Sequence, residues 1–397
     1  MTHDDTPRYL ALADRLGLDR DALERGETIR TTVKIASFED FREIFGGSLT
    51  EAQRDAHSAA HKSRPTSPDS TLALLDELER HVYGRHTLSE QARDYAQTAF
   101  PISAKVMSAT DLVISEDEIL GPGGAPVVIS CDTLTFSGGS IQAITTSLHI
   151  TARELAVNDP GSTHFHIGIL GEKGENGPRG EDGAPYAEPA KTGKKGKTAS
   201  PGVCKSSGGD GDDGARGRNG TDGERGDDGR GSMSANVTID KFAGPNPFIV
   251  FTESGAGGDG GDGGNGGKGQ DGGRGGKGCD SGCTGTNGGN GGKAGEGGDG
   301  LNGGDGGRAV DAWGDIYILF PKEATAMLQT NKSTVSPGKY GNAGKAGLPG
   351  EPGKGGSGGK HANKGKTGKE NSPGMSGSRG EHGKGSGMPA NYQIHYF

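Results

Sequence analysis

The stretch that decides the fold is GGDGGDGGNGGKGQDGGRGGKG at residues 257–278, in which glycine recurs every third residue and no large apolar side chain occurs. A period of three is the repeat of the polyproline II helix, which rises about 3.1 Å per residue and makes no internal hydrogen bonds. Each backbone N–H and C=O must therefore find a partner in water or in a neighbouring rod. Glycine allows that close approach because no Cβ separates the two backbones. The stretch predicts an extended rod packed against other rods.

Five other stretches share this period, so the glycine-rich part of the chain holds six runs in three pairs. The runs cover 168–183, 208–229, 257–278, 288–306, 338–359 and 374–383. Three pairs predict three hairpins of rods within one chain. The middle pair repeats Gly-Gly-X, whereas the outer pairs repeat Gly-X-Y. Two glycine faces per turn suit a rod with neighbours on several sides, so we expect the middle hairpin at the centre of a six-rod bundle.

A collagen-like trimer and a disordered segment are the alternatives for these runs. The single-chain bundle is favoured because paired runs have similar lengths, as up-and-down hairpins require. Proline is scarce in the central runs, although collagen relies on proline and hydroxyproline for stiffness. Rods of about 22 residues would be roughly 70 Å long and would bury almost no side chains. Because ordering each residue costs about 1–2 kcal/mol of backbone entropy, such a bundle needs an anchor.

The anchor is expected upstream, in three stretches that resemble one another: LVISEDEIL (112–120), VVISCDTLTF (127–136) and LHITARELAV (148–157). Their alignment matches two sets of apolar residues, Ile114 with Ile129 and Ile150, and Ile119 with Leu134 and Leu155. Such repeats predict the stacked rungs of a β-solenoid, in which each rung buries its face only against the next. A β-sandwich is the alternative for this part of the chain.

The predicted fold class is therefore mixed, with three kinds of structure in one chain. Residues 1–104 read as a helical module that attaches the protein to a fibre, a particle or a sister subunit, and residues 105–170 read as the first solenoid rungs. The solenoid continues in strand-like stretches at 235–254, 309–323 and 391–397. The glycine-rod hairpins of the bundle cover 168–231, 255–308 and 338–390.

The sequence carries no motif of catalysis or cofactor binding. KKGKT at 194–198 lacks the first glycine of a phosphate-binding loop, because that position is Lys191. His57 and His61 have the i, i+4 spacing of a metal site, but no third ligand accompanies them, so we interpret them as part of a solvated face. KIASFEDFREIFGG at 34–47 reads as a helix that stops at glycine. We expect no enzyme, no metal and no cofactor.

Two of the four cysteines, Cys279 and Cys283, flank Asp-Ser-Gly at the predicted tip of the middle hairpin. A disulfide clip between them is one interpretation, and a reduced pair in a turn is the other. Cys131 lies in a predicted strand and reads as a small core residue. For Cys204 the sequence leaves open a free thiol or a disulfide.

Basic residues gather at the predicted tips of the first and third hairpins, and both tips contain Lys-Gly-Lys-Thr. The candidate ligand-binding residues are Lys191, Lys194, Lys195, Lys197, Lys205, Lys360, His361, Lys364, Lys366 and Lys369. A solvated loop that keeps the tips soluble is one interpretation of these charges. The other is a docking surface for an anionic polymer on a chain whose net charge is −9.

The six glycine runs resemble the architecture of polyglycine-rod bundle proteins over about residues 168–390, without a residue-level match. In layout they are most similar to the tip adhesins of phage long tail fibres, and this resemblance implies a rigid stalk whose tip loops contact a host receptor. Snow-flea antifreeze proteins share the rods, but charged X positions in the central runs disfavour an ice-binding face. The tips here also lack the aromatic residues expected of such adhesins, apart from Tyr186.

We therefore expect a non-enzymatic adhesive or structural protein. The expected partner is a phosphorylated glycan, a teichoic-type chain, an acidic lipid or a nucleic acid; the last is disfavoured because no aromatic residues interleave the lysines. The alternative is a subunit of a filament, coat or surface layer without a receptor, and a homo-oligomer stays open. Because the N-terminus lacks the pattern of a secretory leader, an extracellular, surface or particle location implies another export route, with cytoplasmic storage before release as one option.

Overall fold

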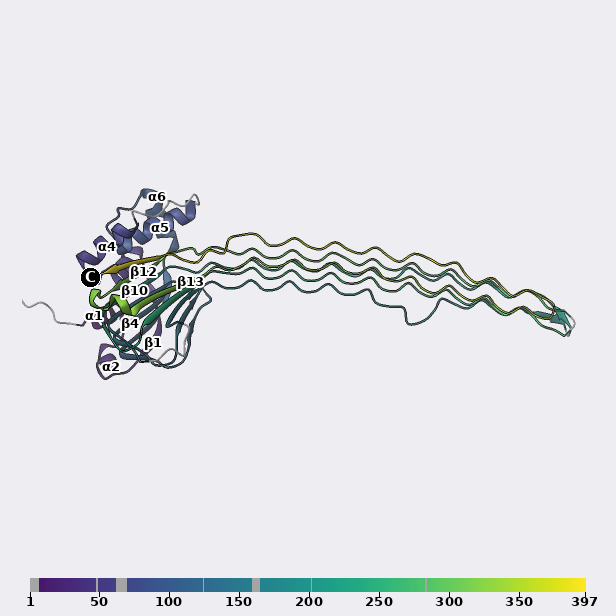
Figure 1. The fold of residues 1–397 in the computed structure, drawn as a ribbon, viewed down its shortest axis with the longest axis horizontal. Coiled ribbons are helices and arrows are strands. Elements are labelled where there is room, and N and C mark those ends of the chain that lie inside the picture. Colours follow the sequence, from purple (N-terminus) through teal and green to yellow (C-terminus); the bar gives the residue numbers. More distant parts are fainter. Residues whose placement is uncertain are drawn as a thin grey trace, which may run out of the picture.

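A computed structural model shows a base of helices and sheets from which a long, narrow shaft projects (Figure 1). The structure describes residues 7–47, 49–61, 70–123, 125–158, 165–200, 202–282 and 284–397. Helices and mostly parallel sheets occur together, so the prediction of a mixed fold is confirmed at this level. In the described part, no helix is long and apolar enough to span a membrane.

The N-terminal part of the base is largely helical, as predicted. Its helices are α1 (Arg8–Leu16), α2 (Arg20–Glu24), α3 (Phe38–Gly46), α4 (Glu51–His61), α5 (Ser70–Tyr83) and α6 (Glu90–Ala99). One prediction is wrong here, because β1 (Ile29–Ile35) is a strand that pairs antiparallel with β2 (Ile102–Ile114). β1 carries five β-branched residues, and its partner supplies the hydrogen bonds that a helix would have made internally.

Two sheets form the rest of the base. The larger one has the order β1–β2–β4–β6–β10–β12–β14, with β4 (Val127–Phe136), β6 (Leu148–Val157), β10 (Ala235–Ala243), β12 (Ile316–Phe320) and β14 (Tyr392–Tyr396). The smaller one has the order β13–β11–β7–β5–β3, with β13 (Leu328–Ser333), β11 (Phe248–Glu253), β7 (Ile167–Leu170), β5 (Ile141–Ile144) and β3 (Glu118–Leu120). Apart from β1–β2, all pairs in these sheets are parallel.

From β2 onward the chain alternates between the two sheets, with the short 3₁₀ helix η1 (Lys322–Met327) between β12 and β13. Each return from the smaller to the larger sheet crosses the same corner of the base. Short loops at 121–126 and 145–147 make the first two crossings. The three later crossings, after β7, β11 and β13, are replaced by the glycine-rich hairpins. The shaft is thus built from long insertions at one corner.

The strand register corrects both predicted alignments for the first stretch and confirms them between the second and the third, where Ile129 lies beside Ile150. Leu134 lies beside Leu155, as expected, but its other neighbour is Leu112 rather than Ile119. Ile114 lies beside Phe136, and Ile119 lies in the smaller sheet beside Gln142. The stretch 112–120 therefore spans a corner between β2 and β3 instead of forming one strand. The alignment of the three stretches failed here because the alternation of apolar and polar residues continues across the bend.

Buried apolar side chains form three clusters in the base, the smallest of which holds Tyr9 and Leu23. The largest cluster lies between the sheets and includes Ile129, Leu134 and Phe248, all fully buried. The second joins α1, α3, α5 and α6 to the larger sheet, so that Phe45 and Val128 share one core. The helices therefore pack directly on the strands, and this shared core crosses the proposed boundary at residue 104.

The shaft consists of six extended segments: S1 (171–197), S2 (205–230), S3 (255–279), S4 (285–309), S5 (336–359) and S6 (362–388) (Figure 1). Backbone hydrogen bonds join S1 to S3 and S3 to S5 in one layer, and S2 to S4 and S4 to S6 in the other. Further backbone hydrogen bonds join each segment to the next one along the chain and hold the two layers together. S3 and S4 thus have four bonded neighbours each, whereas S1 and S6 have two.

One triplet of S3 shows how the backbone is satisfied. The N–H of Gly260 donates to the C=O of Lys339 in S5 (2.8 Å), and that of Gly261 donates to the C=O of Glu224 in S2 (2.9 Å). The third N–H, from Asp259, donates to the side-chain Oδ1 of Asn176 in S1 (2.9 Å). Each of the three donors has a different neighbour, so the triplet needs no internal hydrogen bond.

Close contact between backbones explains the double glycines of the central segments. A Cβ on Gly260 would lie 2.1 Å from the C=O oxygen of Gly304, and a Cβ on Gly261 would lie 1.9 Å from that of Pro178. In S6, by contrast, only one residue in three is a glycine that faces the bundle, such as Gly377, where an added Cβ would lie 2.0 Å from the C=O oxygen of Leu301. The number of glycine faces therefore follows the number of neighbours.

Candidate functional site

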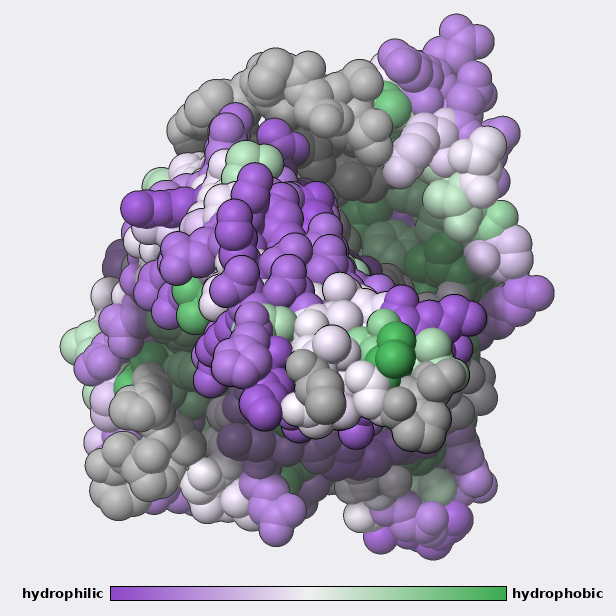
Figure 2. All heavy atoms as spheres, turned by 90° about the vertical axis from the view of Figure 1, so that its right-hand side faces the viewer, coloured by the Kyte–Doolittle hydropathy of each residue, from purple (hydrophilic) through white to green (hydrophobic). Residues whose placement is uncertain are grey.

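The three turns of the shaft meet at its far end, which we call the distal end: residues 190–212, 271–292 and 353–369 (Figure 1). Figure 2 looks onto this end, where hydrophilic residues dominate. The first turn is a short antiparallel hairpin of β8 (Thr198–Ser200) and β9 (Val203–Cys204). The stretch between the first two glycine runs, predicted as the tip of the first hairpin, is mostly extended chain, because the N–H groups of Ala190, Gly193 and Gly196 donate to C=O groups of S3.

A one-residue irregularity explains why the period looked broken there. Gly183 donates to the C=O of Asn265, and Ala190 donates to that of Asp271, so seven residues of S1 face six of S3. The extra residue lies in a bulge that contains Tyr186, whose hydroxyl donates to the C=O of Arg216 (2.9 Å). Past the bulge S1 resumes the same hydrogen-bond pattern in a new phase.

Covalent and polar links tie the distal turns together. Cys279 forms a disulfide with Cys204, which joins the first hairpin to the second. The predicted disulfide between Cys279 and Cys283 is therefore wrong, because Cys279 pairs with Cys204. Cys283 lies outside the described residues. The third hairpin is tied by Lys360, whose Nζ donates to the C=O of Gly282 (3.2 Å). Sequence spacing missed the disulfide because its cysteines are 75 residues apart and meet only through packing of the segments.

All nine predicted lysines and His361 are exposed at the distal end, on the outside of the bundle. Lys191, Lys194, Lys195 and Lys197 lie on S1, and Lys205 begins the neighbouring S2. Lys364, Lys366 and Lys369 lie on S6, with Lys360 and His361 in the preceding turn. Because S1 and S6 occupy opposite corners of the two-layer bundle, the two Lys-Gly-Lys-Thr stretches do not form one patch. They flank the distal end on two sides.

Basic residues that the sequence analysis did not single out lie between these flanks. Lys277 of S3 and Lys354 of S5 are exposed X residues of the repeat. Lys277 also lines an open cleft of about 540 Å³ together with Lys195, Gly196, Lys197, Thr198, Gly278, Cys279 and Asp280. The walls of this cleft are held by the hydrogen bond from Gly196 N–H to the C=O of Lys277 (2.8 Å). Three lysines thus line one recess, in which Asp280 is the single acidic residue.

The balance of charge separates the distal end from the rest of the chain. Its three ranges contain twelve lysine and arginine residues against four aspartates, whereas the whole chain has a net charge of −9. One aspartate, Asp271, is engaged internally: its Oδ1 accepts the N–H of Glu351 (2.8 Å), and this bond, with an ion pair to Lys268, lowers its pKa. The distal end therefore presents a positive surface to solvent.

Among the described residues, no group of three or more His, Cys, Asp or Glu side chains could hold a metal ion. The interpretation of His57 as part of a solvated face is wrong, because His57 is only 3% exposed and its ring packs against Tyr83 and Tyr317. Cys131 is buried in β4 as a free thiol, and burial raises its pKa. No protein-family model, curated protein or solved structure matches this chain.

Proposed function

We propose that this chain is a non-enzymatic adhesive protein in which a rigid shaft presents a basic distal end to an anionic polymer on a surface. The observation that carries the proposal is the separation of roles along the molecule. Apolar packing is concentrated in the base, whereas exposed lysines are concentrated at the far end of the shaft. Clustered positive charge accelerates encounters with an anionic polymer, and its position keeps the base away from the surface.

The finer description of the fold forms part of the same proposal. We propose that S1–S6 are six polyproline II rods and that the alternating strands of the base wind as a β-solenoid. Hydrogen bonds to glycine N–H groups every third residue support the rods, and the common corner at which all hairpins leave supports the solenoid. Sedimentation with circular dichroism tests the rods: a polyproline II signal from a monomer is expected, whereas a trimer that dissociates as it melts would contradict it.

The disulfide between Cys204 and Cys279 is consistent with an oxidising environment, such as the outside of a cell or particle. It joins two of the three distal turns, so it limits their relative motion where a ligand would bind. A fixed set of ammonium groups loses less conformational entropy on binding than a mobile one. The helical part of the base, which lies at the other end of the molecule, is the proposed attachment to a fibre, a particle or a sister subunit.

Serine substitution of the nine predicted distal lysines tests the ligand. The probe is a teichoic-type polymer of phosphodiester-linked sugars, with uncharged dextran as a negative control. The intact protein is expected to bind the polymer in low salt and to weaken as salt rises, because surface charges are screened beyond about 10 Å at 0.1 M salt. The variant is expected to lose at least tenfold in affinity while its melting temperature stays the same.

A matched pair of smaller variants separates site from net charge. One replaces Lys194, Lys195, Lys364 and Lys366 by serine, and the other replaces Lys173, Lys339, Lys345 and Lys384, which are equally exposed but lie outside the distal end. Both remove four positive charges. Loss of binding in the first variant alone supports the distal site. Equal loss in both variants would show that binding depends on the net charge of the protein and not on this site. Unchanged binding in both favours a structural subunit without a receptor.

A further inference from the structure

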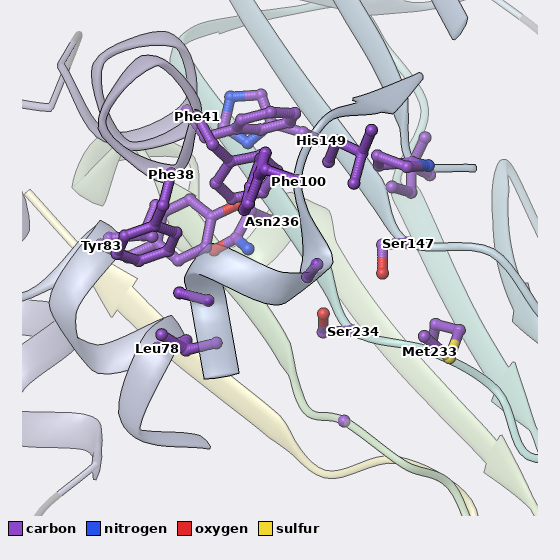
Figure 3. Close-up of a pocket in the computed structure, with 18 of the residues that line it drawn as sticks. Phe38, Phe41, Leu78, Tyr83, Phe100, Ser147, His149, Met233, Ser234 and Asn236 are labelled. Carbon is purple, nitrogen blue, oxygen red and sulfur yellow. The ribbon is translucent and has the colours of Figure 1, made fainter. Parts of the chain in front are cut away.

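A cavity of about 300 Å³ lies inside the base, where α3, α5 and α6 cover the larger sheet (Figure 3). Most of its wall is apolar, and the three phenylalanines of the KIASFEDFREIFGG stretch lie in it. The wall residues are Phe38, Phe41, Phe45, Leu78, Val82, Tyr83, Tyr95, Ala96, Ala99, Phe100, Ile102, Pro126, Ser147, Leu148, His149, Met233, Ser234, Asn236, Trp313 and Gly314. Its size and lining match those of sites that bind small molecules.

The cavity lies at the root of the shaft. Met233 and Ser234 follow S2 directly and precede β10, while Trp313 lies between S4 and β12. Figure 3 shows Ser147, Met233 and Ser234 on one side of the cavity and the aromatic rings on another. Figure 2, viewed along the shaft, shows hydrophobic residues in a hollow beside it. The cavity is therefore formed jointly by the helices and by the corner of the base from which the hairpins leave.

Two polar side chains in this apolar wall each have one unpaired atom. His149 of β6 and Asn236 of β10 are each 3% exposed, and they lie side by side in the register of the two strands. The Nδ1 atom of His149 and the Oδ1 atom of Asn236 are both buried without a hydrogen-bond partner. Buried polar atoms are nearly always paired in folded proteins, and a neighbouring pair of unpaired atoms marks a place for a polar group from outside the chain.

The chemistry of these two atoms limits what that group is. Asn236 Oδ1 only accepts hydrogen bonds, so the incoming group must donate one. His149 is held by Thr151, whose hydroxyl lies 3.1 Å from Nε2, and its ring packs against Phe45 and Tyr83. Burial lowers the pKa of His149 to about 4, so the ring is neutral near pH 7 and its Nδ1 cannot compensate an anion. A hydroxyl group, which donates once and accepts twice, satisfies both atoms.

We propose that this cavity binds a small, mostly apolar molecule that carries a hydroxyl group, such as an alkylphenol. The ring and alkyl chain lie against the phenylalanines of α3 and the apolar side chains of α5 and α6. The hydroxyl donates to Asn236 Oδ1 and accepts a hydrogen bond from Nδ1–H of His149, the tautomer in which Nε2 accepts from the Thr151 hydroxyl. This site is separate from the basic distal end and does not depend on the adhesive function.

Trp313 provides a direct readout, because it lines the cavity and is the only tryptophan of the chain. The full-length protein is titrated with 4-pentylphenol and with pentylbenzene, which differ only in the hydroxyl group. The phenol is expected to change Trp313 fluorescence and to bind at least tenfold more tightly than the arene. Two outcomes would overturn the proposal. If neither probe changes the fluorescence, the cavity holds solvent rather than an apolar molecule. If both probes bind with equal affinity, the hydroxyl group is not recognised.

Two variants assign the preference to the unpaired acceptor. Asn236→Leu keeps a side chain of similar size without Oδ1, and it is expected to reduce the tenfold preference to less than twofold. Ser130→Ala is the matched control, since its hydroxyl is also buried and unpaired but lies outside the cavity; it should keep the preference. A preference that survives in Asn236→Leu contradicts the site. If that variant does not fold, the two probes on the intact protein still decide the question.

Discussion

The base and the shaft of this molecule are stabilised by different interactions. In the base, large side chains such as Leu155 and Phe248 are withdrawn from water, and the strands are held by that burial as much as by their hydrogen bonds. In S3 and S4 the buried residues are almost all glycines, and the contacts are between backbones. The shaft thus replaces side-chain packing by a hydrogen bond from nearly every glycine N–H, and this pattern repeats along its length.

This difference explains why both parts occur in one chain. Hydrogen bonds contribute a net of only about 1 kcal/mol each, which is close to the entropy lost in ordering one residue. Hairpins of glycine alone would therefore be marginal. The base fixes both ends of every hairpin within a few strand spacings, so that the segments start in register. Anchoring by apolar packing is what makes a shaft without an apolar core feasible.

The strongest test of the comparison removes packing from each part. Leu155→Ala in β6 is expected to lower the free energy of unfolding of the base by about 4 kcal/mol, because it leaves a cavity in a fully buried cluster. Leu348→Ala in S5 removes the same atoms from a residue that is 69% exposed, and it should change stability by less than about 0.5 kcal/mol. Chemical unfolding followed by Trp313 fluorescence and circular dichroism measures both. Comparable losses in the two variants would show that the shaft also depends on side-chain burial.

The reverse test adds a side chain to the shaft. Gly266→Val is expected to destabilise the middle hairpin by about 3 kcal/mol, because its Cβ would lie 2.0 Å from the C=O oxygen of Gly298 and would separate backbones that must touch. Lys268→Val places the same side chain two residues away at an exposed position and serves as the control. Thermal unfolding, with proteolysis to locate the opened segment, measures the effect. An unchanged melting temperature for Gly266→Val would mean that S3 is not central.

Much of this division could be read from the sequence, since glycine every third residue and apolar alternation are local patterns. The bounds predicted for β4 and β6 are confirmed, because the alternation of apolar and polar residues there ends at turn residues. Local patterns failed where a distant partner decides, as for β1, which needs β2, and for Cys204, which needs Cys279. The cavity of the base was missed for the same reason, because its wall comes from helices and from the ends of separate strands.

Acid is expected to affect the base before the shaft. Burial lowers the pKa of His149 from 6.5 to about 4, so in this interval the unfolded chain binds the proton more readily than the folded one. Stability is therefore full above pH 6.5 and falls as the pH drops to about 4, by about 3 kcal/mol. The shaft carboxylates Asp271 and Asp299 have lowered pKa values because they accept backbone N–H groups, so they stay ionised throughout this interval.

Unfolding between pH 7 and pH 4 measures this contrast, with Trp313 fluorescence reporting on the base and the circular dichroism signal of the proposed polyproline II rods reporting on the shaft. His149→Leu should remove most of the slope of the base, whereas His361→Gln, at the exposed distal end, should leave it unchanged. A slope that persists in His149→Leu would assign the acid sensitivity to another group. Loss of the shaft signal before that of the base would reverse the comparison.

The smallest expected effect concerns the polar side chains that complete the shaft. Asx residues at X positions accept the N–H that no C=O reaches, and in S4 the Oδ1 of Asn302 accepts the N–H of Ser378 in S6 (2.8 Å). Asn302→Ala leaves that donor to water, and the expected cost is about 1 kcal/mol. Lys293→Ala, at an exposed X position of the same segment, is the control and should cost almost nothing. The measurement is amide hydrogen exchange at Ser378, which should accelerate in Asn302→Ala alone. Equal exchange rates in the two variants would show that the hydrogen bonds of the glycine N–H groups are sufficient to hold S6 and that the Asx side chains do not stabilise the shaft.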